Sequence, residues 1–137
     1  MSGPSPRLPW WRRWFGSRAE RAAVRFLRRL GWRVVRRNYS CPHGEIDIVA
    51  VEGRTVVFVE VRSTESGDEE RPAASVNHEK QTRLTKLALH FLQEHRLLNE
   101  AARFDVLTVT WPAGRREPHI VHYRQAFEAV GRFQMYS

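Results

Sequence analysis

Hydrophobic positions predict two amphipathic helices in this chain. Over residues 19–30, apolar side chains recur every three or four positions, which places them on one face of a helix. Ser17 is the expected N-cap, and Gly31 is the residue expected to end this helix. A longer stripe of the same spacing predicts a second helix over residues 76–98.

The remaining pattern predicts strands. Residues 45–51 alternate between apolar and polar side chains, and residues 55–61 are almost continuously β-branched, as in a central strand buried on both faces. Further strands are expected at 32–39, 104–111 and 119–123, with a short terminal helix at 125–130. The strand–helix–strand unit from 55 to 111 predicts a right-handed crossover and a parallel strand pair. Together these elements predict an α/β fold with a mixed sheet flanked by helices.

Length and composition indicate one globular domain. The 137 residues are 42% hydrophobic and 28% charged, which is ordinary for a folded domain. We expect this domain over residues 19–131, between a flexible tail rich in Trp, Pro and Arg (1–18) and a C-terminal tail (132–137). No apolar run reaches the ~20 residues that span a bilayer, so we expect no integral membrane segment. The single cysteine, Cys41, excludes a disulfide framework and suits a cytoplasmic protein.

Charge is unevenly distributed along the chain. The net charge is +8, and residues 1–37 contribute eleven arginines against one acid, Glu20. Such asymmetry is typical of a protein with a polyanion partner, either nucleic acid or an anionic membrane surface. Four arginines project away from the apolar stripe of the first helix: Arg21, Arg25, Arg28 and Arg29. Because like charges one turn apart repel, a nucleic-acid backbone would relieve them, while a solvated face is the alternative.

Acidic residues stand inside two apolar strands, where an unpaired charge is costly. A hairpin that turns on residues 52–53 would place Glu45, Asp47, Glu60 and Arg62 on one face of the sheet. Asp47 and Glu60 would then be diagonal neighbours, ~7–8 Å apart at the backbone. A register slip of one residue would move Asp47 to the opposite face.

A divalent cation would offset this crowding of carboxylates. Mg²⁺ is commonly held by one or two carboxylates with waters and phosphate oxygens, and it then assists phosphodiester hydrolysis. The alternative is that Glu60 and Arg62 form a surface ion pair while Asp47 pairs with another arginine. Asp105, at the start of a predicted strand, is expected to be structural.

Three segments resemble a known family. The sequences GEIDIVAVEGRTVVFVEVRS, KQTRL and RFDVLTV are similar to those of the YraN family of small bacterial proteins. That family is similar to the restriction-endonuclease-like superfamily, the PD-(D/E)XK nucleases, and in its arrangement to archaeal Holliday-junction resolvases. The resemblance implies an αβββαβ core, with metal-binding acids on the second and third strands and often one on the first helix.

Carried onto this chain, the resemblance implies that Asp47, Glu60 and Glu20 bind a metal, Mg²⁺ or Mn²⁺. Arg62 occupies the position of the superfamily's catalytic lysine, and an arginine stays protonated, so it cannot act as a base. Lys80, on the inward stripe of the second helix, is the candidate replacement, although a snorkelling lysine is equally consistent with that position. Around these residues we expect two supporting polar side chains, Glu45 and Gln81.

The leading hypothesis is a metal-dependent nuclease acting on DNA, either branched or single-stranded. The first alternative is a nucleic-acid-binding module with the same fold and no catalysis, which the arginine at position 62 favours. The second is a protein-interaction or membrane-associated protein that uses its basic aromatic tail. A homodimer is also open, because junction-cutting relatives act as dimers.

Overall fold

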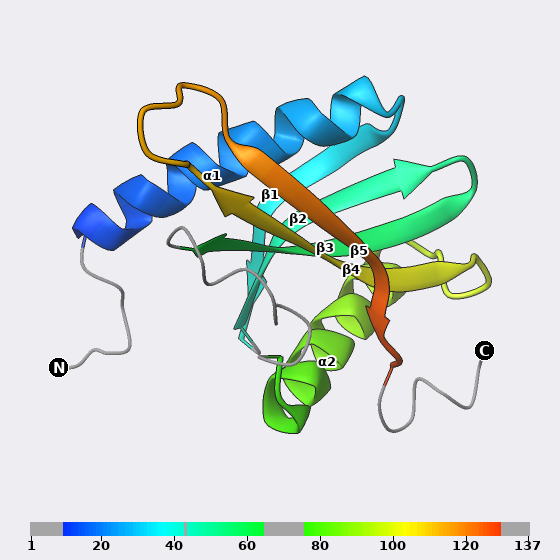
Figure 1. Ribbon diagram of the computed structural model, residues 1–137. Helices are drawn as coiled ribbons and strands as arrows, with labels where there is room; N and C mark the ends of the chain where they lie inside the picture. The colour runs from blue at the N-terminus through cyan, green and yellow to red at the C-terminus, as the bar shows by residue number, and fades with distance from the viewer. Residues whose placement is uncertain (1–9, 43, 65–75, 130–137) are drawn as a thin grey trace, which may run out of the picture.

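A computed structural model describes residues 10–42, 44–64 and 76–129, in which two helices flank one five-stranded sheet (Figure 1). The helices are α1 (Trp10–Arg29) and α2 (His78–Glu94). The strands are β1 (Arg33–Cys41), β2 (Gly44–Glu52), β3 (Thr55–Thr64), β4 (Ala102–Thr110) and β5 (His119–Phe127). Strand order follows the sequence, β3 and β4 are parallel, and the other neighbours are antiparallel. The predicted α/β fold with an αβββαβ core is confirmed.

The two helices cover opposite faces of the sheet (Figure 1). On one face, Leu27 of α1 packs into a buried cluster that includes Val57 of β3. On the other face, Phe91 of α2 packs edge-on against Phe58, with ring centroids 5.8 Å apart. Successive residues of β3 therefore point into two different cores, which confirms the prediction that this strand is buried on both sides.

Helix α1 begins earlier than the sequence analysis predicted. Its first residue is Trp10, so the expected N-cap at Ser17 and the flexible tail over 1–18 are wrong for residues 10–18. In the sequence, Trp11 and Phe15 continue the four-residue spacing that leads to Ala19. The continued periodicity outweighs the interior Gly16, which costs a helix only about 1 kcal/mol. Residues 1–9 and the predicted C-terminal tail lie outside the described part of the chain.

The hairpin between β2 and β3 turns one residue later than predicted. Its two turn residues are Gly53 and Arg54, and Glu52 pairs with Thr55. Gly53 has a φ of 61°, and a glycine at the first turn position is the preference of a tight two-residue hairpin. The register is therefore displaced by two residues from the prediction. Because the displacement is even, it preserves the face to which each side chain points over the paired residues 48–52 and 55–59. Alternation is interrupted just before them, since Ile46 and Ile48 pack into the two different cores.

The terminal helix predicted at 125–130 is wrong, because β5 continues to Phe127. Two long-range contacts hold this segment to the sheet. The backbone N–H of Gln125 donates to Oδ1 of Asp105 at 2.9 Å, and the ring of Phe127 stacks on Phe104 at 4.7 Å. Both partners lie about twenty residues earlier in the chain, so the local apolar spacing could not reveal them.

Helix α2 is shorter than the predicted 76–98 because both of its ends are capped. Asn77 accepts a hydrogen bond from the backbone N–H of Lys80 at 2.8 Å, which fixes the first turn. At the other end, the N–H of His95 bonds back to the carbonyl of Phe91 at 3.1 Å. Over the residues that the structure describes, neither helix is long and apolar enough to cross a bilayer.

Candidate active site

The candidate site lies where β2 and β3 separate. Their backbone ladder ends at the pair Ile48 and Val59, and the next residue on each strand is an acid, Asp47 on β2 and Glu60 on β3. Oδ2 of Asp47 accepts a hydrogen bond from the backbone N–H of Val61 at 2.8 Å. The carboxylate oxygen thus accepts a hydrogen bond that a backbone carbonyl would accept if the ladder continued. If the corrected register were continued by one pair, Asp47 would stand opposite Glu60 rather than diagonal to it.

Burial and neighbouring acids raise the pKa of Asp47 to about 7. Desolvation is the largest cause, the negative charge of Glu60 is the second, and Glu20 and Glu45 add to both. The Val61 hydrogen bond favours the ionised form but does not offset these effects. A carboxylate held in this way gains from any cation placed between it and Glu60.

Two cationic side chains lie on Glu60. Nζ of Lys80 is 2.5 Å from Oε2 of Glu60, and Nη1 of Arg62 is 3.7 Å from the same oxygen. Lys80 reaches this position from the first turn of α2, where Asn77 caps the helix. Nη1 of Arg62 is buried and has no hydrogen-bond acceptor among the described residues. The Arg62 guanidinium therefore has a donor available for a further negatively charged group.

Glu20 approaches the site from α1 and is only 5% exposed. Its Oε1 accepts a hydrogen bond from Nδ2 of Asn38 at 3.1 Å, and its Oε2 is 3.8 Å from Nε of Arg37. That second oxygen is buried and accepts no hydrogen bond within the described residues. The β1–β2 register places Asn38 opposite Asp47, so Glu20 and Asp47 belong to the same corner of the molecule.

The structure brings together some of the predicted metal ligands but not all of them. Asp47 and Glu60 directly follow the last pair of the β2–β3 ladder, and the charge of Glu60 acts strongly on Asp47. Glu20 acts on Asp47 more weakly, and its own carboxylate is held by β1. The described residues contain no group of three or more His, Cys, Asp or Glu side chains that could hold a metal ion. The fit for Mg²⁺ or Mn²⁺ therefore rests on two carboxylates with hard oxygen ligands, Asp47 and Glu60, with Glu20 as a third acid whose Oε2 accepts no hydrogen bond within the described residues.

The other predicted residues occupy the surroundings. Glu45 is exposed on β2, and its charge helps to raise the pKa of Asp47. Gln81 donates from Nε2 to the carbonyl of Val76 at 2.7 Å, so it anchors the segment before α2. All four predicted arginines of α1 are exposed: Arg21, Arg25, Arg28 and Arg29.

Two asparagines that the sequence analysis did not select support the site. Asn77 positions Lys80, and Asn38 holds Glu20. Asn38 has a φ of 53°, a conformation that non-glycine residues other than Asn and Asp rarely adopt. An asparagine inside a predicted strand was the available signal, because asparagine is depleted in strands.

Asp105 belongs to a separate buried cluster. It accepts hydrogen bonds from Arg103 at 2.9 Å and from Gln125, and it lies 2.8 Å from Nε2 of His122. Despite the opposing effect of burial, the hydrogen bonds from His122, Arg103 and Gln125 lower the pKa of Asp105. This fully satisfied carboxylate ties β5 to β4, in agreement with the structural role predicted for it.

Comparison with known proteins gives the family. The profile of the uncharacterised protein family UPF0102 matches residues 19–109. A UPF0102 protein of Geobacter metallireducens is 42% identical over 113 residues, which are 82% of this chain and 91% of the relative. One from Myxococcus xanthus is 44% identical over 119 residues, covering 86% of this chain and 92% of the relative. The chain therefore belongs to the UPF0102 (YraN) family, a member of the restriction-endonuclease-like superfamily.

Proposed function

We propose that this protein is a metal-dependent nuclease that hydrolyses phosphodiester bonds of DNA. The observation that carries the proposal is the pair of acids at the end of the β2–β3 ladder, where Asp47 and Glu60 meet on neighbouring strands. Lys80 and Arg62 both contact Glu60, so among the described residues Asp47 has no ion-pair partner. Mg²⁺ or Mn²⁺ is the cation that oxygen ligands of this kind hold together with phosphate oxygens.

In this proposal Asp47 and Glu60 hold the metal, with Glu20 as an accessory acid. When bound, such an ion lowers the pKa of a water molecule and offsets negative charge on a phosphate. Arg62 cannot take up a proton, so its role is to bind and orient a phosphate oxygen through Nη1, which has no hydrogen-bond acceptor among the described residues. The ammonium group of Lys80, adjacent to Glu60, supplies the cation that superfamily nucleases place two residues after the third-strand acid.

The proposed substrate is the backbone of branched or single-stranded DNA. The exposed arginines of α1 offer charge to phosphates without any arrangement for reading bases. Cutting two strands at a junction would require two sites, so we also propose a homodimer as the cutting form. Light scattering of the protein with and without a junction substrate measures the number of copies.

The test is cleavage of a panel of single-stranded, duplex and branched DNA with Mg²⁺, with Mn²⁺ and with EDTA. We expect metal-dependent cleavage that Asp47→Ala and Glu60→Ala abolish. Glu128→Ala is the control, because it removes an exposed acid that follows β5 and is not among the proposed metal ligands. Cleavage that persists in EDTA, or in either site variant, would contradict the proposal.

The second candidate is a nucleic-acid-binding module without catalysis. It is favoured by the two cations on Glu60, because an ion pair of this kind leaves one acid already neutralised. Tight, salt-sensitive DNA binding without cleavage in any metal would select it. Lys80→Ala separates the two candidates further, since loss of cleavage with unchanged DNA affinity is expected only of the nuclease.

A further inference from the structure

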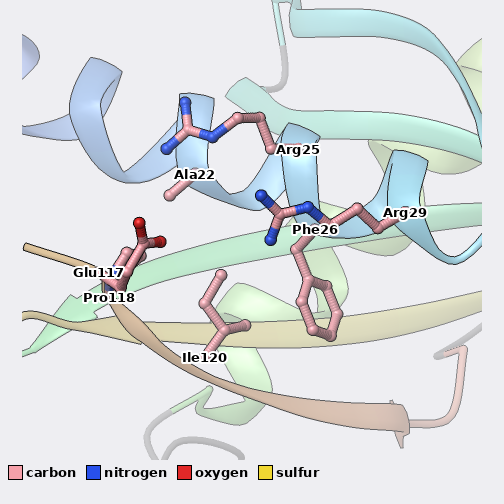
Figure 2. A pocket seen from close by; sticks show the side chains of 7 residues that line it. All are labelled: Ala22, Arg25, Phe26, Arg29, Glu117, Pro118 and Ile120. Atoms are coloured by element: carbon pink, nitrogen blue, oxygen red, sulfur yellow. The ribbon is translucent and has the colours of Figure 1, made fainter.

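A hollow of about 200 Å³ lies between α1 and the segment that leads into β5 (Figure 2). On the helix side it is lined by Arg25, Phe26 and Arg29. On the other side it is lined by Glu117, Pro118 and Ile120. Figure 2 shows the two guanidinium groups on the helix side and the carboxylate of Glu117 facing them across the opening.

This hollow is separate from the candidate active site. Arg29 follows Glu20 by nine residues, which is about two and a half turns of helix, so the two side chains leave α1 on opposite sides. Glu20 points toward β1, where it meets Asn38, whereas Arg25 and Arg29 border the β5 side. A ligand in the hollow would therefore not touch the acids of β2 and β3.

The two arginines have no ion-pair partner among the described residues. Within the part of the chain that the structure describes, neither Arg25 nor Arg29 forms an ion pair, although the two stand one turn apart and repel each other. Arg29 gains some stabilisation from the carboxyl end of the helix, but Arg25 lies too far from that end. Two guanidinium groups one turn apart, beside an apolar floor, can donate hydrogen bonds to the same anion.

We propose that the hollow binds one backbone phosphate of a nucleic-acid strand, held between Arg25 and Arg29. Phe26 and Ile120 form the apolar floor on which the adjoining sugar rests. This inference rests on the nucleic-acid partner of the proposed function, but not on cleavage. It gives the substrate a second contact, on the side of α1 away from the metal-binding acids.

Glu117 allows a test in which a substitution should strengthen DNA binding. Its carboxylate faces the arginines without forming an ion pair with either of them, so it repels a phosphate that enters between them. Glu117→Gln removes that repulsion and keeps the shape of the side chain. The substitution is therefore expected to tighten DNA binding several-fold.

The experiment measures fluorescence anisotropy of labelled single-stranded and duplex oligodeoxynucleotides with the full chain, in EDTA and over a range of salt. The test variant is Arg25→Ala with Arg29→Ala. The matched control is Arg21→Ala with Arg28→Ala, which removes the same charge from exposed positions of α1 outside the hollow. Thermal unfolding verifies that both double variants are folded.

We expect the test variant to lose at least about tenfold in affinity, because charge-assisted hydrogen bonds are lost. The slope of log affinity against log salt should fall by about one, as expected for a single phosphate contact. The control should lose markedly less. Equal losses in the two double variants, or weaker binding by Glu117→Gln, would overturn the proposal.

Two further readouts fix the source of the phosphate and keep this proposal separate from cleavage. Inorganic phosphate, tested as a competitor, should displace the oligonucleotide only weakly. If phosphate displaces it from the wild type at concentrations that do not affect the test variant, the hollow binds free phosphate, and the proposal of a backbone phosphate is overturned. Because EDTA removes the metal, DNA binding at the hollow can be measured even if the protein never cleaves DNA. If the protein is a nuclease but the test variant binds DNA as tightly as the wild type, only the proposed phosphate site is refuted.

Discussion

Asp47 is subject to opposing effects on its charge at the candidate site. It needs the Val61 N–H for its position, yet burial and Glu60 both disfavour its charge. At pH values below its ordinary pKa the carboxyl is neutral in the folded and the unfolded chain. As the pH rises from 3.8 toward about 7, the unfolded chain loses its proton first, so folding becomes less favourable.

The residue-scale prediction concerns Asp47→Asn, which preserves an oxygen acceptor for Val61 but cannot ionise. Relative to this variant, the wild type should lose stability between pH 4 and pH 7, by up to about 4 kcal/mol for a shift of about three units. Urea unfolding across this pH range measures the difference. Asp105→Asn is a control with the opposite expectation. The pKa of Asp105 is lowered in the fold, so the wild type should gain stability relative to Asp105→Asn as the pH rises to about 4. A constant difference between wild type and Asp47→Asn would contradict the prediction.

At the scale of elements, β1 shows how strand shape positions an acid on a helix. Asn38 takes a positive φ in the middle of the strand and donates to Glu20 of α1. Its place in the register is opposite Asp47. The bend at this one residue therefore connects β1, β2 and α1 at the candidate site.

Two variants of Asn38 separate its backbone role from its hydrogen bond. Asn38→Gly tolerates the positive φ but loses the donor, so it leaves the buried Glu20 carboxylate less well satisfied and costs about 1–3 kcal/mol. Asn38→Ala loses the donor and adds backbone strain, so it should be less stable still. Urea unfolding at neutral pH gives both values. If Asn38→Gly is as stable as the wild type, the bond to Glu20 contributes nothing.

The elements also show what the sequence could predict. Periodicity is a local property, so it correctly gave the strands and the parallel β3–β4 pair. The hairpin register depended instead on which residue accepted the positive φ, namely Gly53. The end of β5 depended on Asp105, and the orientation of Glu20 depended on Asn38, 18 residues away. These contacts join distant parts of the chain, and no local pattern encodes them.

At the scale of the whole molecule, the net charge of +8 attracts polyanions and repels divalent cations. A metal ion can therefore bind only where local acids outweigh the general field. The place that we propose is at Asp47 and Glu60, the acids that follow the last pair of the β2–β3 ladder. The nearest positive charges, Lys80 and Arg62, both contact Glu60, so a metal ion would have to compete with them.

Metal binding should consequently raise the thermal stability of the protein, and this gain should depend on Asp47. A ligand that binds only the folded chain adds about 2.7 kcal/mol at 100 times its dissociation constant, enough to raise Tm by several degrees in a domain of this size. We expect Mn²⁺ to raise the Tm of the wild type and to leave that of Asp47→Ala unchanged, with differential scanning calorimetry as the measurement. Binding should strengthen as the pH rises through about 7, because Asp47 must lose its proton to hold the ion. Equal Tm shifts in wild type and Asp47→Ala would place the metal elsewhere, whatever the result of cleavage assays.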